Sequence, residues 1–271
     1  MNKGEEYKDK FSSITEALSY AKIEQIESLI INPRAYLTQF YQRDLDSGDK
    51  ALLRFYARVY KDLQGRSLLE FGGGPTIYSL ITAARTVSWI HFTDYSTECL
   101  SEVSKWLIED SSAFDWTKYT NYALYSESGS TRKPSEKDVL NRHRLIRQRV
   151  RQITRCDASA TDPLLGSFLG PYGVVANSFC LDALTTDKDV WFRLNQKVAN
   201  LVEKDGFFIS VYLLNATYWT FQGIKYPAVN LTLGDVINMY SSLGLRITHK
   251  ESVQLNRTGY DGFVMVCGKK S

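Results

Sequence analysis

The residues with the clearest chemical meaning are three consecutive glycines, Gly72 to Gly74, which lie between an apolar stretch at 67–71 and a helical pattern that starts near Ile77. Glycines at a turn from a strand to a helix let a ligand approach the backbone closely. A dinucleotide fingerprint G-x-G-x-x-G beginning at Gly72 needs a glycine at position 77, and a P-loop needs Gly-Lys-Ser/Thr after the turn; the sequence has neither. The turn therefore predicts a ligand without the pyrophosphate of NAD or FAD.

An acidic residue, Asp94, ends the second predicted strand, at roughly the spacing at which dinucleotide folds place their ribose-binding acid. A carboxylate there can accept hydrogen bonds from both ribose hydroxyls. Taken alone, Asp94 is explained equally well as a helix N-cap, and the glycines alone could form a tight turn without a ligand. Taken together, the two features favour a nucleoside, and S-adenosylmethionine is such a ligand.

The surrounding sequence alternates between strand and helix patterns, which predicts an α/β domain with a mostly parallel sheet and helices on both faces. The predicted strands cover residues 67–71, 88–93, 173–177, 207–213, 245–253 and 262–267. The predicted helices cover a capped segment at about 13–31 and residues 36–41, 50–63, 77–84, 97–108, 190–203 and 233–242. The last two strands follow each other directly, so one of them should run antiparallel to the rest.

Two segments in the middle of the chain need separate interpretations. Residues 109–135 are polar and aromatic with little periodicity, and we interpret them as an insertion. After them, Val139, Ile146, Val150 and Ile153 recur at helical spacing, which predicts one amphipathic helix. Residues 132–155 carry nine Lys/Arg against two acidic residues, a net charge of +7. A solvated helix face explains this charge better than a nucleic-acid groove, because no aromatic residues interleave the basic ones.

The composition excludes several classes of protein. The 271 residues are 44% hydrophobic with a net charge of only +3, which indicates a single domain over residues 1–271 and argues against a nucleic-acid binder. The four cysteines form no C-x-x-C pair and the three histidines are scattered, so we expect neither a metal site nor a disulfide framework. The sequence has no membrane-length apolar run and no signal-peptide pattern at its start. We therefore expect a monomeric cytoplasmic protein without a membrane partner.

Five short blocks occur in a characteristic order: NPRAYLTQFY at 32–41, GGGPTIY at 72–78, TDY at 93–95, SAFDW at 112–116 and SFCLDA at 178–183. In these blocks the chain resembles the family of small-molecule N-methyltransferases that includes nicotinamide, phenylethanolamine and indolethylamine N-methyltransferases. The resemblance implies a Rossmann-like, seven-stranded, mostly parallel methyltransferase sheet, with S-adenosylmethionine as methyl donor. It also implies an N-terminal helical lid at 1–48 and insertions near the acceptor site at 109–135 and 214–232.

The resemblance also implies a set of cofactor-binding residues. Lid residues Tyr36 and Tyr41 would cover the methionine end of the cofactor, Asp94 would hold the ribose, and Asp157 would accept from the adenine amine. The remaining expected cofactor contacts are Gly72, Gly74, Thr76 and Tyr78 at the methionine end, Ala158 beside Asp157, Ser178, and Cys99, which replaces an asparagine of the family. The cysteine leaves one polar contact of the family without a counterpart.

For the acceptor, the chemistry requires a nitrogen that carries a free lone pair, held in line with the methyl group and shielded from water. A carboxylate near the acceptor could bind a protonated amine and take its proton. Asp182, a glutamate in the family, is the first candidate and Asp261 the second; a helix cap and a turn, respectively, are the structural alternatives. Phe179, Tyr218 and Trp219 are the expected acceptor-facing aromatic residues, although a core or hairpin role explains the aromatic residues at 218–226 about as well.

Three functions stay open at this point. The leading one is methylation of an amine or heterocyclic nitrogen of a small molecule. The second is methylation of a hydroxyl, or of RNA through the basic segment at 132–155. The third is a protein that keeps the cofactor fold without turnover, which the intact glycine turn and Asp94 argue against.

Overall fold

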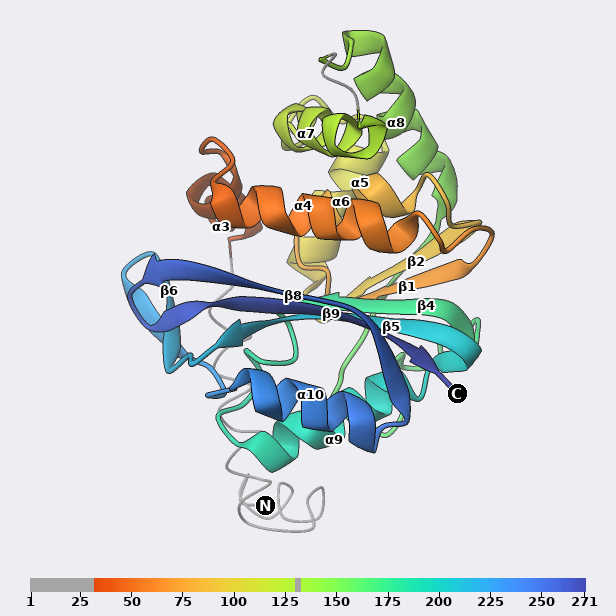
Figure 1. Ribbon diagram of the computed structural model, residues 1–271. Coiled ribbons are helices and arrows are strands. Elements are labelled where there is room, and N and C mark those ends of the chain that lie inside the picture. The colour runs from red at the N-terminus through yellow and green to blue at the C-terminus, as the bar shows by residue number, and fades with distance from the viewer. Residues whose placement is uncertain (1–31, 130–132) are drawn as a thin grey trace, which may run out of the picture.

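The computed structural model describes residues 32–129 and 133–271, and the predicted helix at 13–31 lies outside them (Figure 1). A seven-stranded sheet has the order β3-β2-β1-β4-β5-β9-β8, and β6 and β7 form a separate two-stranded sheet. The strands are β1 (Ser67–Phe71), β2 (Trp89–Asp94), β3 (Val150–Arg155), β4 (Tyr172–Ser178), β5 (Val202–Leu214), β6 (Tyr218–Phe221), β7 (Ile224–Pro227), β8 (Leu245–Arg257) and β9 (Tyr260–Lys270). The helices are α3 (Pro33–Tyr41), α4 (Ser47–Tyr60), α5 (Tyr78–Ala83), α6 (Thr97–Leu107), α7 (Thr117–Ser128), α8 (Glu136–Arg149), α9 (Lys188–Ala199) and α10 (Leu233–Ser242).

The strand directions follow from the connections between strands. Strand β1 pairs in parallel with β2 and with β4. At least one helix lies between β1 and each of these strands along the chain, as a parallel pairing requires. Strand β9 pairs antiparallel with both β5 and β8, and a short turn joins β8 to β9. The expectation that one of the last two strands runs antiparallel is therefore confirmed.

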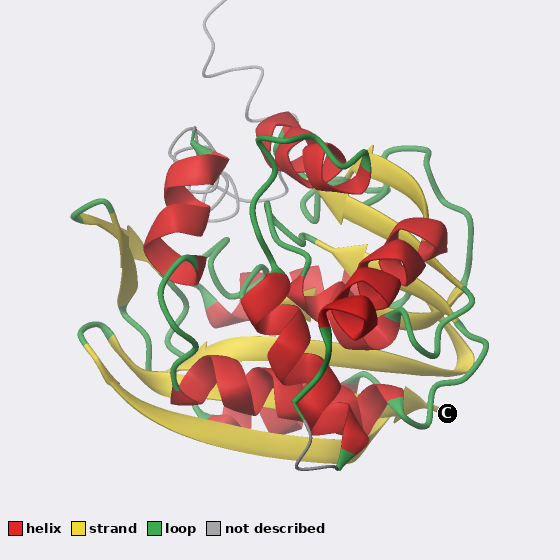
Figure 2. Cartoon of the chain, turned by 90° about the horizontal axis from the view of Figure 1, so that it is seen from above, coloured by secondary structure: helices red, strands yellow, loops and turns green. Residues whose placement is uncertain are grey.

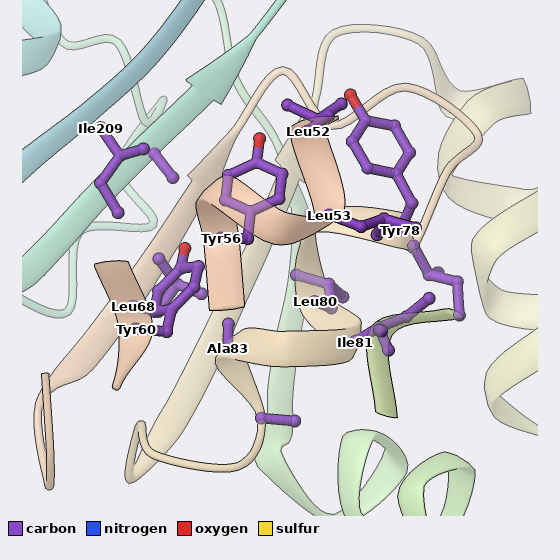
Figure 3. Close-up of a cluster of buried hydrophobic side chains, with 14 of the residues drawn as sticks. Leu52, Leu53, Tyr56, Tyr60, Leu68, Tyr78, Leu80, Ile81, Ala83 and Ile209 are labelled. Carbon is purple, nitrogen blue, oxygen red and sulfur yellow. The ribbon is translucent and has the colours of Figure 1, made fainter. Parts of the chain in front are cut away.

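Helices cover both faces of the seven-stranded sheet (Figure 1), and each of the two layers of helices packs on the sheet through its own hydrophobic core. Helices α4, α5, α6, α7 and α8 contribute to one core, and α9 and α10 contribute to the other. Figure 3 shows part of the first core, which contains Leu52 and Leu53 of α4, Leu80 of α5 and the sheet residue Leu68. Because β1 is covered on both faces, its residues 68–71 are all buried and three of these four are apolar, which explains why its bounds were predictable from the sequence.

The segment at 109–135, interpreted as an insertion without regular structure, contains the helix α7. Its buried positions are few, with Tyr119, Thr120 and Ala123 inside, so its apolar stripe is too narrow to produce a clear periodicity. Gly129 ends the helix in a left-handed conformation with a φ of 59°.

The prediction of one helix through Val139, Ile146, Val150 and Ile153 is wrong in its second half. Helix α8 ends at Arg149, and Val150 and Ile153 lie in β3, which pairs with β2. The helical spacing therefore continued by coincidence into a strand whose residues are only partly buried. Similarly, α9 ends at Ala199 and β5 begins at Val202, five residues before the predicted start at 207.

The β6–β7 hairpin, one of the alternatives for the aromatic residues at 218–226, lies at one end of the molecule beside the turn between β8 and β9 (Figures 1 and 2). The N–H of Thr217 donates to the carbonyl of Gly259 in that turn, at 2.9 Å. The Gln39 side chain of α3 donates to the Thr220 carbonyl at 3.2 Å and accepts from the Gln222 N–H at 3.0 Å. The hairpin thus connects α3 to the far end of the sheet. No helix among the described residues is long and apolar enough to cross a membrane.

Candidate active site

A cavity of about 520 Å³ lies where the carboxyl ends of β1, β2, β3 and β4 meet, under α3 and the start of α4. Parallel sheets of this kind bind ligands at this edge. The cavity brings together fourteen of the sixteen residues expected from the sequence, which are Tyr36, Tyr41, Gly72, Gly74, Thr76, Tyr78, Asp94, Cys99, Asp157, Ala158, Ser178, Phe179, Asp182 and Trp219.

The glycine turn requires glycine for two different reasons. Gly72 and Gly74 have φ values of 67° and 60°, in the left-handed region that side chains disfavour. A Cβ atom at Gly72 would also collide with Sγ of Cys180, whereas a Cβ at Gly74 would meet no atom within 4 Å. The backbone at Gly74 therefore presents an open surface to the cavity, as a turn that binds a ligand should.

Asp94 fixes this turn to the next strand. Its Oδ2 accepts from the Gly74 N–H at 2.7 Å, and its Oδ1 accepts from the Ser96 N–H at 2.9 Å. Burial raises the pKa of Asp94 to about 6, although these backbone hydrogen bonds oppose the rise. Ser96, not Asp94, is the N-cap of α6. A carboxylate can accept about four hydrogen bonds, so Asp94 retains acceptor capacity toward the cavity.

Two further expected residues line the cavity near the ends of β2 and β3. Oδ1 of Asp157 accepts from the N–H of Ser159 at 2.8 Å and from its hydroxyl at 2.5 Å. Cys99 is buried in the first turn of α6, and burial raises the pKa of its thiol. The thiol is therefore neutral and offers only a weak hydrogen bond where an amide would offer strong ones.

Helix α3 covers the cavity with aromatic side chains. It begins at Pro33 after the N-cap Asn32, whose side chain accepts from the Ala35 N–H. The ring of Tyr41 stacks on that of Tyr78, with centroids 5.6 Å apart and planes at 20°. Tyr36 forms a side-chain hydrogen bond with Tyr41, but burial is the larger effect and raises its pKa to about 12. Both phenols are therefore neutral at physiological pH.

Aromatic residues of the β6–β7 hairpin form a wall beside Tyr36, and Trp219 of this wall lines the cavity. Trp219 of β6 stacks on Tyr226 of β7 with centroids 4.6 Å apart, and its ring meets Tyr36 edge-on at 6.5 Å. Phe221 packs against Tyr36 at 5.8 Å. Tyr218, which was expected beside Trp219, does not line the cavity; Nζ of Lys225 lies 4.3 Å from its ring centroid.

Asp182 is the buried carboxylate of the site, with only 1% of its surface exposed. Its Oδ2 accepts from the Leu213 N–H at 2.8 Å, and its Oδ1 has no partner among the described residues. Burial raises the pKa of Asp182 to about 7. Asp182 lies in a turn and the next helix, α9, is capped by Asp187, so the helix-cap explanation does not apply.

The backbone just before Asp182 is strained. Phe179 has a φ of 55°, which is unusual for a bulky residue, and its N–H is held by the Val211 carbonyl at 2.9 Å. Strain of this kind concentrates at functional sites. The second candidate carboxylate, Asp261, is exposed, accepts from the Asn215 side chain at 2.8 Å and does not line the cavity.

Sequence reasoning missed a cluster of charged residues at the cavity rim. Arg43 pairs with Asp49 at 2.7 Å and with Asp46 at 3.2 Å, and Arg257 pairs with Asp46 at 2.7 Å. Asp46 and Asp49 form the capping box of α4. The acidic residues three apart before a helical pattern were a detectable signal, but Arg257 lies more than 200 residues away and gave none.

The basic residues of the segment at 133–155 mostly serve the protein's own structure. Arg142 is buried and pairs with Glu127 at 2.7 Å. Arg147 lies over the Trp106 ring at 4.3 Å, and Arg155 lies over the Tyr95 ring at 4.7 Å. The described residues contain no group of His, Cys, Asp and Glu that could hold a metal ion.

Comparisons with known proteins agree with this geometry. The model of the NNMT/PNMT/TEMT family matches residues 22–271. Nicotinamide N-methyltransferase of Homo sapiens is 30% identical over 207 residues, which cover 74% of this chain and 76% of that protein. Phenylethanolamine N-methyltransferase of Sus scrofa is 30% identical over 197 residues, which cover 69% of this chain and 68% of that protein.

Solved structures share the fold. Magnesium protoporphyrin IX methyltransferase (ChlM) from Synechocystis PCC 6803 with bound SAH has a TM-score of 0.57 at 10% sequence identity, and the match covers 92% of this chain and 100% of that chain. The expected seven-stranded methyltransferase sheet with helices on both faces is therefore confirmed.

Proposed function

Because this chain belongs to the NNMT/PNMT/TEMT family and is an S-adenosylmethionine-dependent N-methyltransferase, we propose that its acceptor is an amine or heterocyclic nitrogen of a small molecule. One observation carries the proposal. A single cavity of about 520 Å³ extends from the glycine turn and Asp94 to the aromatic wall and Asp182. A cofactor and a small acceptor can therefore meet in one chamber.

The cavity residues around the glycine turn, Asp94 and Asp157 fit S-adenosylmethionine. We place the ribose at Asp94, which has unused acceptor capacity, and the adenine near Asp157 and Ala158, because they follow the edge strand β3. The methionine portion then lies over the glycine turn, near the tyrosines of α3. The residues proposed to surround that portion are Gly72, Gly74, Thr76, Tyr78, Tyr36, Tyr41, Cys99 and Ser178.

When bound, S-adenosylmethionine supplies an electrophilic methyl group on a sulfonium. The contribution of the protein is to exclude water and to orient the acceptor nitrogen, and α3 with the aromatic wall of Trp219 fits both tasks. Phe179 borders the same space, and we propose that it contacts the acceptor. Neutral phenols and a buried indole present few charges that could compete for the nitrogen lone pair.

Asp182 is proposed to bind the protonated form of an amine acceptor and to take its proton. A base works best when its pKa is close to the working pH, and burial places the pKa of Asp182 at about 7. The charge of the cavity also favours a cation. Its lining contains five carboxylates and two guanidiniums, which belong to Asp46, Asp49, Asp94, Asp157, Asp182, Arg43 and Arg257. Asp261 stays a weaker candidate because it lies outside the cavity lining.

A cavity of about 520 Å³ favours a small molecule over RNA, and so does the use of Arg142, Arg147 and Arg155 in contacts within the protein. We further propose a single-domain, monomeric enzyme of small-molecule metabolism in the cytoplasm. The four cysteines, which form no disulfide, are consistent with a reducing compartment.

The experiment that tests this function is an acceptor screen that detects S-adenosylhomocysteine release. The panel contains primary and secondary amines, pyridines, guanidines, phenols and a structured RNA. We expect release with a nitrogen nucleophile, together with a product one methyl group heavier. Release only with phenols or RNA would contradict the proposal, and cofactor binding without release from any acceptor would favour a protein without turnover.

A further inference from the structure

The hydroxyl of Ser178, at the end of β4, forms a hydrogen bond with a residue outside the cavity. The hydroxyl of Tyr56, from α4, lies 2.5 Å from Ser178 Oγ. Tyr56 is fully buried and does not line the cavity, whereas Ser178 does. Tyr78, the first residue of α5, also lines the cavity. In Figure 3 the hydroxyls of Tyr56 and Tyr78 point to the same side of the view.

The direction of this hydrogen bond follows from the chemistry of the two groups. Burial raises the pKa of Tyr56 well above the usual value, so the phenol keeps its proton. A buried phenol needs an acceptor for its proton, and Ser178 is the hydrogen-bond partner that the described residues offer to Tyr56. A serine hydroxyl has one donor and two acceptor positions. The Tyr56 phenol therefore fills one acceptor position and leaves the Ser178 proton to be donated elsewhere.

The order of the sheet indicates what receives this proton. Along the edge of the sheet the strands follow as β3, β2, β1 and β4, and their ends carry Asp157, Asp94, the glycine turn and Ser178. With adenine and ribose at the first two positions, the methionine portion of the cofactor lies at the last two. That portion carries an ammonium, which only donates, and a carboxylate, which only accepts.

We propose that Tyr56 is a positioning residue that makes the Ser178 hydroxyl a donor to the carboxylate of the bound cofactor. The inference rests on the cofactor placement of the proposed function, but not on the identity of the acceptor. It assigns a role in ligand binding to a core residue that the ligand does not touch. No bond is made or broken, and the hydroxyl proton stays on Ser178.

A matched control lies one helical turn away. Tyr60 projects from α4 beside Tyr56, with ring centroids 6.0 Å apart, and is equally buried (Figure 3). Its hydroxyl has no partner among the described residues, and it does not line the cavity. Tyr60→Phe therefore removes the same atom from the same helix without touching Ser178.

The test is titration calorimetry of the full chain with two ligands, S-adenosylhomocysteine and methylthioadenosine, which lacks the amino-acid portion. We expect Tyr56→Phe to weaken S-adenosylhomocysteine about tenfold and to leave methylthioadenosine unchanged, because only the first ligand carries a carboxylate. Ser178→Ala should do the same, and the double variant should bind no more weakly than Ser178→Ala alone. Tyr60→Phe should leave both affinities at the wild-type value.

Several results would overturn the inference. An equal loss for both ligands in Tyr56→Phe indicates a general structural role, and additive losses in the double variant indicate that the two residues act separately. If Tyr56→Phe does not fold, Ser178→Ala alone decides, since an unchanged preference between the ligands contradicts the donor role. If the wild type binds neither nucleoside, the cofactor placement itself is wrong, whereas the absence of turnover with every acceptor would not affect this measurement.

Discussion

Replacement of Asp182 by Asn tests the acceptor side of the site through two separate measurements. The substitution keeps the shape of the side chain, and the amide oxygen can still accept from the Leu213 N–H, which lies 2.8 Å from Oδ2. What it removes is the charge on a residue that is 1% exposed. If Asp182 binds a cationic amine, kcat/KM should fall roughly ten- to a hundredfold, about 1.4–2.7 kcal/mol, while the affinity for S-adenosylhomocysteine stays the same.

The second measurement is the pH dependence of stability. Burial raises the pKa of Asp182 from 3.8 in the unfolded chain to about 7 in the folded protein. The folded state therefore binds the proton more tightly, so this group lowers the free energy of unfolding as the pH rises from about 4 to about 7. At 1.36 kcal/mol per pKa unit the loss is roughly 4 kcal/mol at most. Asp182→Asn lacks this loss and should be more stable than the wild type at pH 8 but not at pH 4.

Urea unfolding of the ligand-free protein at both pH values measures the difference directly. Asp261→Asn is the control, because Asp261 is exposed and outside the cavity lining, and it should change neither stability nor kcat/KM. Equal stability differences at pH 4 and pH 8 would refute the raised pKa. An unaltered kcat/KM in Asp182→Asn would remove this residue from the acceptor site.

Three further substitutions or measurements examine the cofactor half of the site. Asp94→Ala should weaken S-adenosylhomocysteine by tenfold or more, because charge-assisted hydrogen bonds of about 1.5–3 kcal/mol each are lost; an unchanged affinity in calorimetry would contradict the ribose assignment. Gly72→Ala should lower both the melting temperature and cofactor affinity, because its φ of 67° is unfavourable for alanine and Cβ collides with Cys180; a wild-type melting temperature would contradict the need for glycine. Amide hydrogen exchange in α3 (Pro33–Tyr41) should slow when S-adenosylhomocysteine binds, because the helix covers the cavity, and identical exchange with and without the ligand would show that it is not a lid.

The parts of the fold that were predictable from the sequence are those in which one local pattern decides the structure. Strands β1, β2 and β4 are covered on both faces, so their apolar runs mark them clearly. The edge strand β3 is only partly buried and has a mixed composition, which let a helical spacing extend into it. Helix α7 buries few residues, and the β6–β7 hairpin depends on contacts with α3 and with the β8–β9 turn.

The same distinction applies to the site. Gly72 and Asp94 belong to short motifs, and the structure places both beside the cavity. The pairing of Asp46 with Arg257 joins residues that are 211 positions apart, and only the tertiary fold brings them together. Asp261 is a reasonable candidate by type, but it is the exposed second residue of β9 and accepts a hydrogen bond from the Asn215 side chain.

The most direct test of the account is the fate of a labelled methyl group. The purified enzyme is mixed with S-adenosylmethionine carrying a carbon-13 methyl and with the best acceptor from the screen, and the products are followed by NMR. We predict that the label appears on a nitrogen of the acceptor in amounts equal to the S-adenosylhomocysteine formed. Label on an oxygen, or S-adenosylhomocysteine formed without methylated acceptor, would contradict the claim that this cavity positions a small-molecule nitrogen for methyl transfer.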